Sequence, residues 1–541
     1  GGNAVNTIVT HDQSIRASTI NLDGTSYLTI RNMTIDVSAG TGLDKWGIHI
    51  WNGANNIIID NNIITMTVGI SSDVAGIMIS NSETSDNTTA DVDSLTISNN
   101  LVTGGERGIS VYGNFTPAAR SQTLTINNNV IRDADDNGLY IAGYNDVTIT
   151  NNFVDGLNNS FSDGMYSSDL ENFTITGNRF KGGDNGLEGN DYNFDNTVST
   201  KSLIANNIFI GGDDGLYLDD VAEINVYHNT TSASDYGIYL NDDVNLDISN
   251  NIFSSNGGDY AFYGLDGNPI TMDYNIFYTS GSNLVKFGIP FYTDLAAFQS
   301  ANATLNVNSL SDDPMFINVP NDLTPLSDSL DNKGTPITGI TTDINGNPRS
   351  TTTPDIGAVE FTAPELVPFM EDFQTFGPSL SIGTNGWTRT AAFNPRFQSG
   401  PFTSSTATGP AADHTIGAGG TFVYLETSSS TPGNSDTLVS PQIFLGTNDT
   451  TVYLEYWYHM WGSDMGALEV FVDTNGTLIP ISSFTGQQQA NQSDAWRLDA
   501  HLINGLEGKL IQLKFVGVAG SSFNGDLAID DISLGMPPSC F

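Results

Sequence analysis

Five short segments decide the fold: LTISNN at residues 95–100, LTINNN at 124–129, VTITNN at 147–152, FTITGN at 173–178 and LDISNN at 246–251. Each is a copy of one unit in which apolar and polar residues alternate and a polar turn closes on asparagine. Because successive side chains of a strand point to opposite faces, this alternation predicts a short β-strand. From Asn129 onward the copies lie 22 to 29 residues apart, including weaker ones; the weaker copies end at Asn62, Asn207, Asn229 and Asn275.

A second short strand recurs between these copies. It begins with glycine and places one variable residue between two aliphatic ones, as in GIHI at 47–50, GIMI at 76–79, GISV at 108–111, GLYI at 138–141, GLYL at 215–218 and GIYL at 237–240. Two or three strands in a repeat of about 25 residues, with no helix between them, cannot build a globular core alone. Stacked coils can, because each coil buries its aliphatic side chains against its neighbours. The repeat therefore predicts a right-handed parallel β-helix.

This pattern resembles the parallel β-helix repeat family of secreted carbohydrate-active and surface proteins, over residues 14–290. The resemblance implies the fold much more strongly than any activity. The recurring asparagines are expected to stack as a ladder whose amides bond the backbone of tight turns. His228 lies beside this column, and we expect it to be structural as well.

The repeat is lost after residue 290. The stretch TDINGNPRSTTTPDIGAVEF at 342–361 resembles the closing segment of bacterial β-helix surface proteins, and a strand ending in IGAVEF is expected to cover the open end of the stack. We therefore assign residues 1–361 to the β-helix with its capping segment, and residues 362–366 to a linker.

Residues 367–541 carry short strands bounded by glycine, asparagine and proline, which predicts a β-sandwich. Four motifs in order resemble the MAM domain, a jelly-roll-like adhesion module known from meprins, neuropilins and receptor tyrosine phosphatases: TGPAADHT at 408–415, DTLVSPQI at 436–443, YWYHMWGSDMGALEVFV at 456–472 and GDLAIDDISL at 525–534. Animal MAM domains use disulfides, whereas this chain has one cysteine, Cys540, and so resembles the cysteine-poor bacterial form. The predicted fold class is all-β.

The same resemblance implies a structural calcium ion in the sandwich. The carboxylates that it would assign to this site are those of Glu371, Asp372, Asp413, Asp530 and Asp531. Oxygen ligands of this kind suit Ca²⁺. The alternative is that Asp413 and the Asp530–Asp531 pair only cap turns and strand ends.

Composition excludes several classes of function. The 541 residues include 61 Asp+Glu against 17 Lys+Arg, a formal net charge of −44, which disfavours nucleic acid and anionic lipid as partners. A single cysteine excludes a disulfide framework and a cysteine-rich zinc site within the chain. No apolar run approaches the roughly 20 residues that span a bilayer, so no direct membrane insertion is expected. Small polar residues are abundant, as in extracellular β proteins.

The variable residue of the second strand points away from the core and forms a column along the stack. Aromatic rings with a polar edge can stack on sugar faces, so the column suggests a glycan-binding platform. The alternative is that the rings only cover and stabilise the sheet. The column reads His49, Met78, Ser110, Tyr140, Tyr166, Glu188, Tyr217, Tyr239 and Tyr263, and its five tyrosines are the predicted glycan contacts.

Aspartates flank these strands on both sides. Stacked carboxylates repel one another unless they are protonated, hydrated or bridged by cations such as calcium. Glu188 with Asp191, Asp213 or Asp214 could supply the carboxyl pair of a glycoside hydrolase. The segment GGDDGLYL at 211–218 faintly resembles the paired-aspartate motif of polygalacturonases, but the other signatures of that family are missing. A polysaccharide lyase would need a basic residue, and those near the column lie at its far end.

The sequence thus predicts a secreted or cell-surface adhesion protein that contacts glycans, with calcium as a structural ion. Its expected partners are a polysaccharide or cell-surface glycan and other surface proteins. Two alternatives stay open at this point. One is a polysaccharide lyase or glycoside hydrolase acting on the β-helix face, and the other is a structural spacer in a larger surface fibre.

Overall fold

The structure is a computed structural model. It describes residues 8–10, 17–38, 45–67, 74–83, 85–156, 162–193, 201–266, 270–377, 383–446 and 449–535, so Cys540 lies outside the described residues. The chain divides into two compact units, Gly1–Thr362 and Ala363–Phe541. In the part of the chain that the structure describes, no helix is long and apolar enough to cross a membrane.

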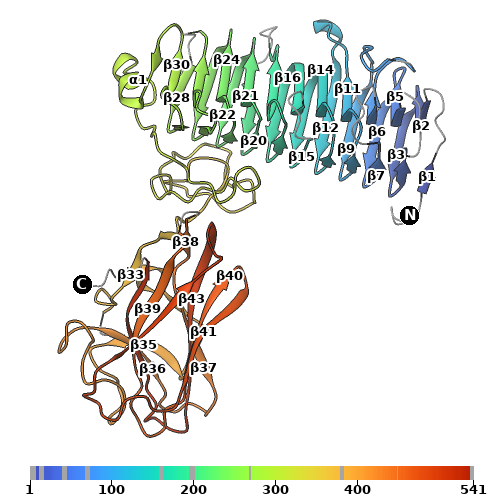
Figure 1. The fold of residues 1–541 in the computed structure, drawn as a ribbon. Coiled ribbons are helices and arrows are strands. Elements are labelled where there is room, and N and C mark those ends of the chain that lie inside the picture. Colours follow the sequence, from blue (N-terminus) through green and yellow to red (C-terminus); the bar gives the residue numbers. More distant parts are fainter. Residues whose placement is uncertain are drawn as a thin grey trace. The chain divides into compact units, whose positions relative to one another are not determined.

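The first unit is a stack of coils, each built from three short parallel strands (Figure 1). One strand of each coil contributes to an 11-stranded sheet, which we call the short-strand sheet. Its members are β1 (Ile8–Thr10), β4 (Thr34–Asp36), β7 (Ile63–Thr65), β10 (Leu101–Thr103), β13 (Val130–Arg132), β15 (Phe153–Asp155), β17 (Arg179–Lys181), β20 (Ile208–Ile210), β23 (Thr230–Ser232), β26 (Ile252–Ser255) and β29 (Ile276–Thr279).

The other two strands of each coil form two faces of a 20-stranded sheet. The face that carries the glycine-led strands, here the column face, contains β2 (Ala17–Asp23), β5 (Lys45–Trp51), β8 (Ala75–Ile79), β11 (Arg107–Tyr112), the first half of β14 (Asn137–Thr150), the first half of β16 (Asp163–Thr176), β18 (Leu187–Asn190), β21 (Asp214–Asp219), β24 (Tyr236–Asn241), β27 (Phe262–Gly264) and β30 (Val285–Phe287). The face before the asparagines contains β3 (Ser26–Arg31), β6 (Asn55–Asp60), β9 (Asp93–Ser98), β12 (Ser121–Asn127), the second halves of β14 and β16, β19 (Ser202–Ala205), β22 (Ala222–Tyr227), β25 (Val244–Ser249) and β28 (Ile270–Asp273).

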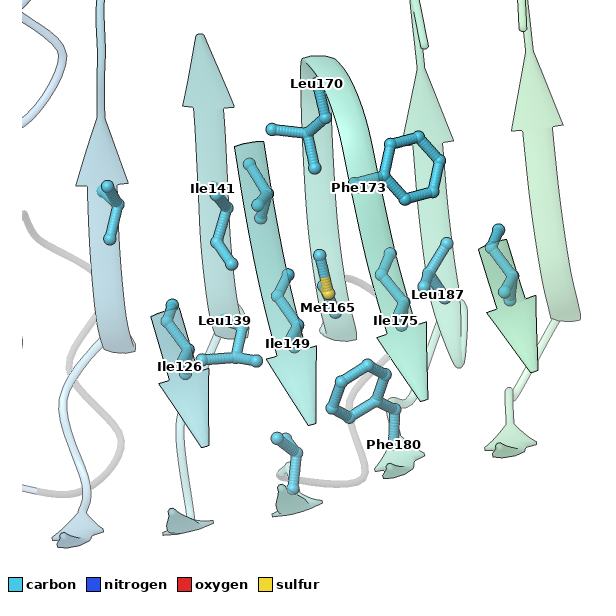
Figure 2. Close-up of a cluster of buried hydrophobic side chains, with 14 of the residues drawn as sticks. Ile126, Leu139, Ile141, Ile149, Met165, Leu170, Phe173, Ile175, Phe180 and Leu187 are labelled. Atoms are coloured by element: carbon cyan, nitrogen blue, oxygen red, sulfur yellow. The ribbon is translucent and has the colours of Figure 1, made fainter. Parts of the chain in front are cut away.

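Aliphatic side chains from all three faces fill the interior of the stack. Leu139 and Ile141 point inward from the column face, and Ile149 and Ile175 point inward from the next (Figure 2). The recurring glycine fits this close stacking, since a Cβ at Gly138 would lie 2.1 Å from Val154 Cγ1 and 2.8 Å from the carbonyl oxygen of Gly164. The alternating pattern in the sequence therefore predicted the strands and the core correctly.

The expected asparagine ladder is present. Its members are buried, and each Nδ2 except that of the last member, Asn275, donates to Oδ1 of the asparagine in the next coil at 3.0 Å, for example from Asn178 to Asn207. Each Nδ2 also donates to a backbone carbonyl, which for Asn178 is that of Ile149 at 2.9 Å. The asparagine ladder runs through Asn62, Asn100, Asn129, Asn152, Asn178, Asn207, Asn229, Asn251 and Asn275.

Residues that precede the ladder adopt a left-handed backbone, with φ of 56° at both Asn99 and Asn151. Asparagine tolerates this region better than most residues. His228 takes the same position, at φ 52°, and its buried ring contacts Asn250 Nδ2 at 3.0 Å. These contacts agree with the structural role expected for His228.

The closing segment differs from its prediction. Ile356 and Ala358 lie in no strand and pack against outward-facing aliphatic residues of the short-strand sheet, Ile208 and Ile252 among them. These residues would otherwise expose apolar surface, which explains why the segment covers the side of the stack. Helix α1 (Leu295–Ala301) joins the coil core instead, through Leu295 and Phe298, after β31 (Phe291–Tyr292) pairs with β30.

The second unit is a β-sandwich, as predicted. One sheet contains β32 (Glu365–Leu366), β38 (Ile443–Leu445), β43 (Lys509–Val518), β37 (Ser435–Val439), β34 (Thr388–Arg389), β40 (Ala467–Thr474) and β41 (Thr477–Thr485). The other contains β35 (Arg396–Gly400), β36 (Phe422–Glu426), β44 (Ala528–Gly535), β39 (Val452–His459), β42 (Arg497–Ile503) and β33 (Phe369–Glu371). Their facing side chains, including Trp387, Tyr456 and Phe515, form one apolar core. Two short 3₁₀ turns, η2 (Pro117–Ala119) and η3 (Thr384–Gly386), complete the regular elements.

Candidate functional site

The outward column of the column face has the predicted register. Parallel pairing aligns Tyr140 with Tyr166, Tyr217 with Tyr239 and Tyr239 with Tyr263, and it places Glu188 between Tyr166 and Tyr217. The whole column reads Asn21, His49, Met78, Ser110, Tyr140, Tyr166, Glu188, Tyr217, Tyr239, Tyr263 and Lys286.

The first part of this column is not exposed, contrary to expectation. His49, Met78 and Ser110 are at most 1% exposed. Trp46 packs with Met78, and His49 Nε2 contacts the carbonyl oxygen of Ser80 at 2.8 Å. The accessible tyrosines of the column therefore begin at Tyr140, and this covered stretch separates them from the exposed Asn21.

The tyrosines form two stacks. In the first stack, the ring centroids of Tyr112 and Tyr140 are 6.1 Å apart and those of Tyr140 and Tyr166 are 5.1 Å apart. The guanidinium of Arg107 lies 4.4 Å from the centroid of the Tyr140 ring. The rings of the first stack are nearly parallel, at 8° and 12°, and all three are half-buried.

The second stack contains Tyr217, Tyr239 and Tyr263, with successive centroids 4.4 and 5.5 Å apart at angles of 3° and 11°. Tyr236, which sequence reasoning missed, stacks on Tyr263 at 4.3 Å. Lys286 closes this stack, with Nζ 4.2 Å from the Tyr263 ring and 2.8 Å from its hydroxyl. The second stack thus ends in a cation and widens into an aromatic patch.

Glu188 occupies the gap between the two stacks and is held by two asparagines. Asn190 Nδ2 donates to Glu188 Oε1 at 3.0 Å, and Asn185 Nδ2 donates to Glu188 Oε2 at 3.1 Å. The same Asn185 Nδ2 lies 3.1 Å from Asp163 Oδ1. One amide therefore bridges the carboxyl groups of Glu188 and Asp163, which we call the bridged pair.

Burial and mutual repulsion raise the pKa values around this pair. The pKa of Asp163 rises to about 8, first through burial and then through the charge of Glu188. Burial raises the pKa of Asp214 to about 7, and burial with the neighbouring Asp213 raises that of Asp184 to about 6. Burial also raises the pKa of Glu188. A row of carboxyl groups with staggered pKa values is typical of sites that exchange protons.

The structure selects among the acidic candidates. Asp213 is exposed in the turn before β21, and Asp214 is buried at its start. Asp191 follows β18 with a left-handed φ of 55°, at the other end of the strand from Asp163. Sequence reasoning named Asp191, Asp213 and Asp214 as candidate partners of Glu188 and missed Asp163. The signal was present, because Asp163 and Asp214 occupy the same place in DGMY and DGLY.

A separate acidic group lies at the far end of these strands. Carboxylate oxygens of Asp219, Asp220 and Asp242 all lie within 4.8 Å of one another. Asn241 Nδ2 donates to Asp219 Oδ1 at 2.7 Å. Two of the three residues are exposed, so water can also hydrate this group.

The predicted calcium ligands of the sandwich lie in two connected places. Asp530 and Asp531 meet the loop after Asp413, where the His414 backbone amide donates to Asp530 Oδ2 at 3.0 Å. Burial, with the charges of Asp531 and Asp413, raises the pKa of Asp530 to about 9. Gln374 Nε2 donates to the carbonyl oxygen of Asp372 at 2.9 Å and to Asp413 Oδ2 at 2.8 Å.

Glu371 is engaged differently from the other four predicted ligands. Its Oε1 accepts from the backbone amide of Phe373 at 2.8 Å, and its Oε2 accepts from Trp387 Nε1 at 3.2 Å and Asn385 Nδ2 at 3.1 Å. These three donors account for both oxygens. Calcium binding by the five residues stays a prediction.

Comparison with known proteins finds a matching family model for each of the two units. The family model "Right handed beta helix region" matches residues 4–154 and 119–309, and "MAM domain, meprin/A5/mu" matches residues 381–541. Human MAM domain-containing glycosylphosphatidylinositol anchor protein 2 is 34% identical over 137 residues, 24% of this chain and 14% of that protein. Neuropilin-1 of Xenopus laevis is 31% identical over 131 residues, 23% of this chain and 13% of that protein.

The chain thus spans about one seventh of the length of these curated relatives. Among solved structures, TmCBM61 in complex with β-1,4-galactotriose is similar over 31% of this chain and 94% of that one, with 15% identity and a TM-score of 0.22. A likeness at this score carries no argument about function. On the two family matches, the chain belongs to the family with a right-handed β-helix region and carries a MAM domain after the helix.

Proposed function

We propose that this protein is a secreted or cell-surface adhesion protein that binds a polysaccharide along the column face. The observation that carries the proposal is the pair of parallel tyrosine stacks in successive coils. Coils repeat every ~4.8 Å, so a sugar chain lying along the stack meets a half-buried ring at each step of either stack and the Glu188 carboxylate between them. Because the faces of the rings stack on one another, the rings present their edges and hydroxyls to the sugar chain.

The negative charge of the chain limits the class of glycan that the column face can bind. Carboxyl groups flank both stacks in a chain with a net charge of −44, and this field repels polyanions. A neutral polysaccharide fits the face best. Two relatives support a place at a cell surface, since their names describe a glycosylphosphatidylinositol anchor.

Affinity electrophoresis of the full chain against a panel of neutral polysaccharides tests the proposal. We expect Tyr217→Ala combined with Tyr239→Ala to weaken binding roughly thirtyfold, since each of the two lost aromatic contacts costs about 1 kcal/mol. Tyr27→Ala is the matched control, because Tyr27 is 83% exposed on another face of the coils. Unchanged binding by the double variant would refute the platform.

The bridged pair supports a second candidate, glycoside hydrolysis at the gap between the stacks. Asp163, with a pKa of about 8, would hold the proton that the leaving oxygen needs, and Glu188 would act as base or nucleophile. Release of reducing sugar by the full chain tests this candidate. Glu188→Gln and Asp163→Asn should each abolish release while Asp191→Asn retains it. Equal release by all three variants would exclude the bridged pair.

Calcium completes the proposed function as a structural ion in the sandwich. The cluster of Asp413, Asp530 and Asp531 supports it, because buried carboxyl groups that repel one another gain from a cation. Addition of a chelator should lower the melting temperature of the full chain, and Asp530→Asn should reduce that shift. A melting temperature that does not respond to chelator would count against the ion.

A further inference from the structure

Two carboxyl groups face each other across neighbouring strands of the sandwich, outside the predicted calcium cluster. The antiparallel pair β36–β44 aligns Val423 with Ile529 and Tyr424 with Ala528. Leu425 continues this ladder, since its amide donates to the carbonyl oxygen of Leu527 at 2.8 Å. The next position of the same register sets Glu426 opposite Asp526. Like charges at directly opposed positions destabilise a sheet.

Each of these carboxylates has one oxygen satisfied and one without a partner. Glu426 Oε1 accepts from the Ser428 amide at 2.8 Å, and Asp526 Oδ1 accepts from the Thr427 amide at 2.9 Å. Glu426 Oε2 and Asp526 Oδ2 have no hydrogen-bond partner, although both atoms are inaccessible to solvent. Glu426 is 4% exposed and Asp526 is fully buried. Two orphaned carboxylate oxygens at one place are costly without a ligand.

Protein cations do not neutralise the pair in the described structure. No ion pair within 4.0 Å involves either carboxylate among the described residues, even though Arg396 lies opposite Glu426 in the β35–β36 pairing. Ser405 Oγ lies 3.4 Å from Glu426 Oε1, so the loop after β35 closes over the pair. Burial, followed by the charge of Glu426, raises the pKa of Asp526 to about 7.

A shared proton would satisfy both groups only if the two carboxyls were in hydrogen-bond contact. No such bond joins them among the described hydrogen bonds, whereas the charge of Glu426 still acts on Asp526. A hard cation can reach two oxygens that cannot reach each other, because it binds each at about 2.4 Å. Both groups are carboxylates, and hard oxygen donors of this kind favour calcium over softer metals.

We propose that Glu426 Oε2 and Asp526 Oδ2 bind a divalent cation of the calcium class at the end of the β36–β44 ladder. This site is distinct from the cluster of Asp413, Asp530 and Asp531. It ties the last strand of the domain to β36 beneath the loop that carries Ser405. The inference does not depend on glycan binding by the β-helix.

Calorimetric titration of the chelator-stripped full chain with CaCl₂ tests the site. Glu426→Gln and Asp526→Asn should each remove one equivalent of bound calcium, and each should shrink the chelator-induced fall in melting temperature. Asp464→Asn is the matched control, an exposed acid whose carboxylate bonds Ser521 and Ser522. Asp530→Asn should leave the equivalent assigned to Glu426 and Asp526 in place.

The opposite results overturn the proposal. An unchanged number of equivalents in Glu426→Gln would show that the carboxylates hold no cation. Higher thermal stability of the same variant in chelator and in calcium alike would assign the pair to a proton. Should Asp526→Asn fail to fold by circular dichroism, the Glu426→Gln titration decides alone.

Discussion

The asparagine ladder and the acidic groups of the column face are built by the same stacking of coils, yet one is satisfied and the other is not. Each ladder amide has a donor and an acceptor, so Asn178 gives to Asn207 and receives from Asn152 without limit along the stack. A carboxylate has acceptors only. Asp163, Asp184 and Asp214 therefore cannot complete one another from coil to coil, and burial, followed by the charges of neighbouring carboxylates, raises their pKa values.

This difference separates two uses of one architecture. Inward columns need side chains whose hydrogen-bond donors and acceptors pair with one another, and this pairing stabilises the stack. Outward columns can carry side chains that do not satisfy one another's hydrogen bonds, because water or a ligand can supply the missing partners. The Tyr and Glu positions of the column face are of the second kind, and for this reason they are the better candidates for function.

The largest expected effect comes from breaking the ladder. Asn178→Leu removes five hydrogen bonds, three given by Nδ2 and two accepted by Oδ1, and leaves buried partners unsatisfied. We expect a loss of about 4 kcal/mol in the free energy of unfolding. Urea denaturation of the full chain, followed by circular dichroism, measures it.

Asn151→Ala provides the control for this experiment. Asn151 precedes the ladder, is exposed, and has a left-handed φ of 56°, so its loss should cost only about 1 kcal/mol. Equal effects of the two substitutions would mean that turn geometry, and not the ladder, stabilises the coils.

A smaller change in the free energy of unfolding, of opposite sign, is expected where an aspartate occupies a position similar to that of a ladder asparagine. Asp243 is 3% exposed, and its Oδ1 accepts from the Val221 amide at 3.1 Å as a ladder asparagine would, but its Oδ2 has no partner. Burial raises the pKa of Asp243 to about 9 from 3.8. Asp243→Asn supplies the missing donor, and we expect it to stabilise the protein by about 2 kcal/mol at pH 7.

The size of this effect depends on pH. A folded-state pKa above the unfolded value gives stability that is complete below pH 3.8 and is lost as pH rises toward 9. The gain from Asp243→Asn should therefore grow between pH 4 and pH 8 in thermal melts. A gain that is constant across this range would contradict burial of a neutral carboxyl.

The repeat made the coils and the register of the outward column predictable. The glycine that begins each strand of the column face marks equivalent positions in successive coils. The alignment of Tyr217 with Tyr239 could therefore be predicted from the sequence alone. The course of the closing segment could not be predicted. The IGAVEF pattern predicts that Ile356 is buried, but it does not identify the residues that Ile356 packs against. One of them is Ile252, and nothing in the sequence distinguishes Ile252 from other strand residues.

The candidate site was predictable only in part, for related reasons. Met78 is buried with the Trp46 side chain, and His49 contacts the carbonyl oxygen of Ser80, just after β8; the repeat specifies neither contact. The choice of Asp163 over Asp191 depends on the side chain of Asn185 in the neighbouring coil. Repeats fix positions along a column, whereas contacts made by irregular turns have no repeat from which to be inferred.

The smallest stability effect is expected on the outward column, and it decides between the two interpretations of the tyrosines. Tyr239 is half-buried between rings at 4.4 and 5.5 Å, so Tyr239→Ala should cost about 1 kcal/mol in urea denaturation. Binding to the neutral polysaccharide identified by affinity electrophoresis should fall severalfold in the same variant. If Tyr239→Ala instead cost as much as Asn178→Leu and left binding intact, the column would be a cover for the sheet, and the division between inward and outward columns would fail.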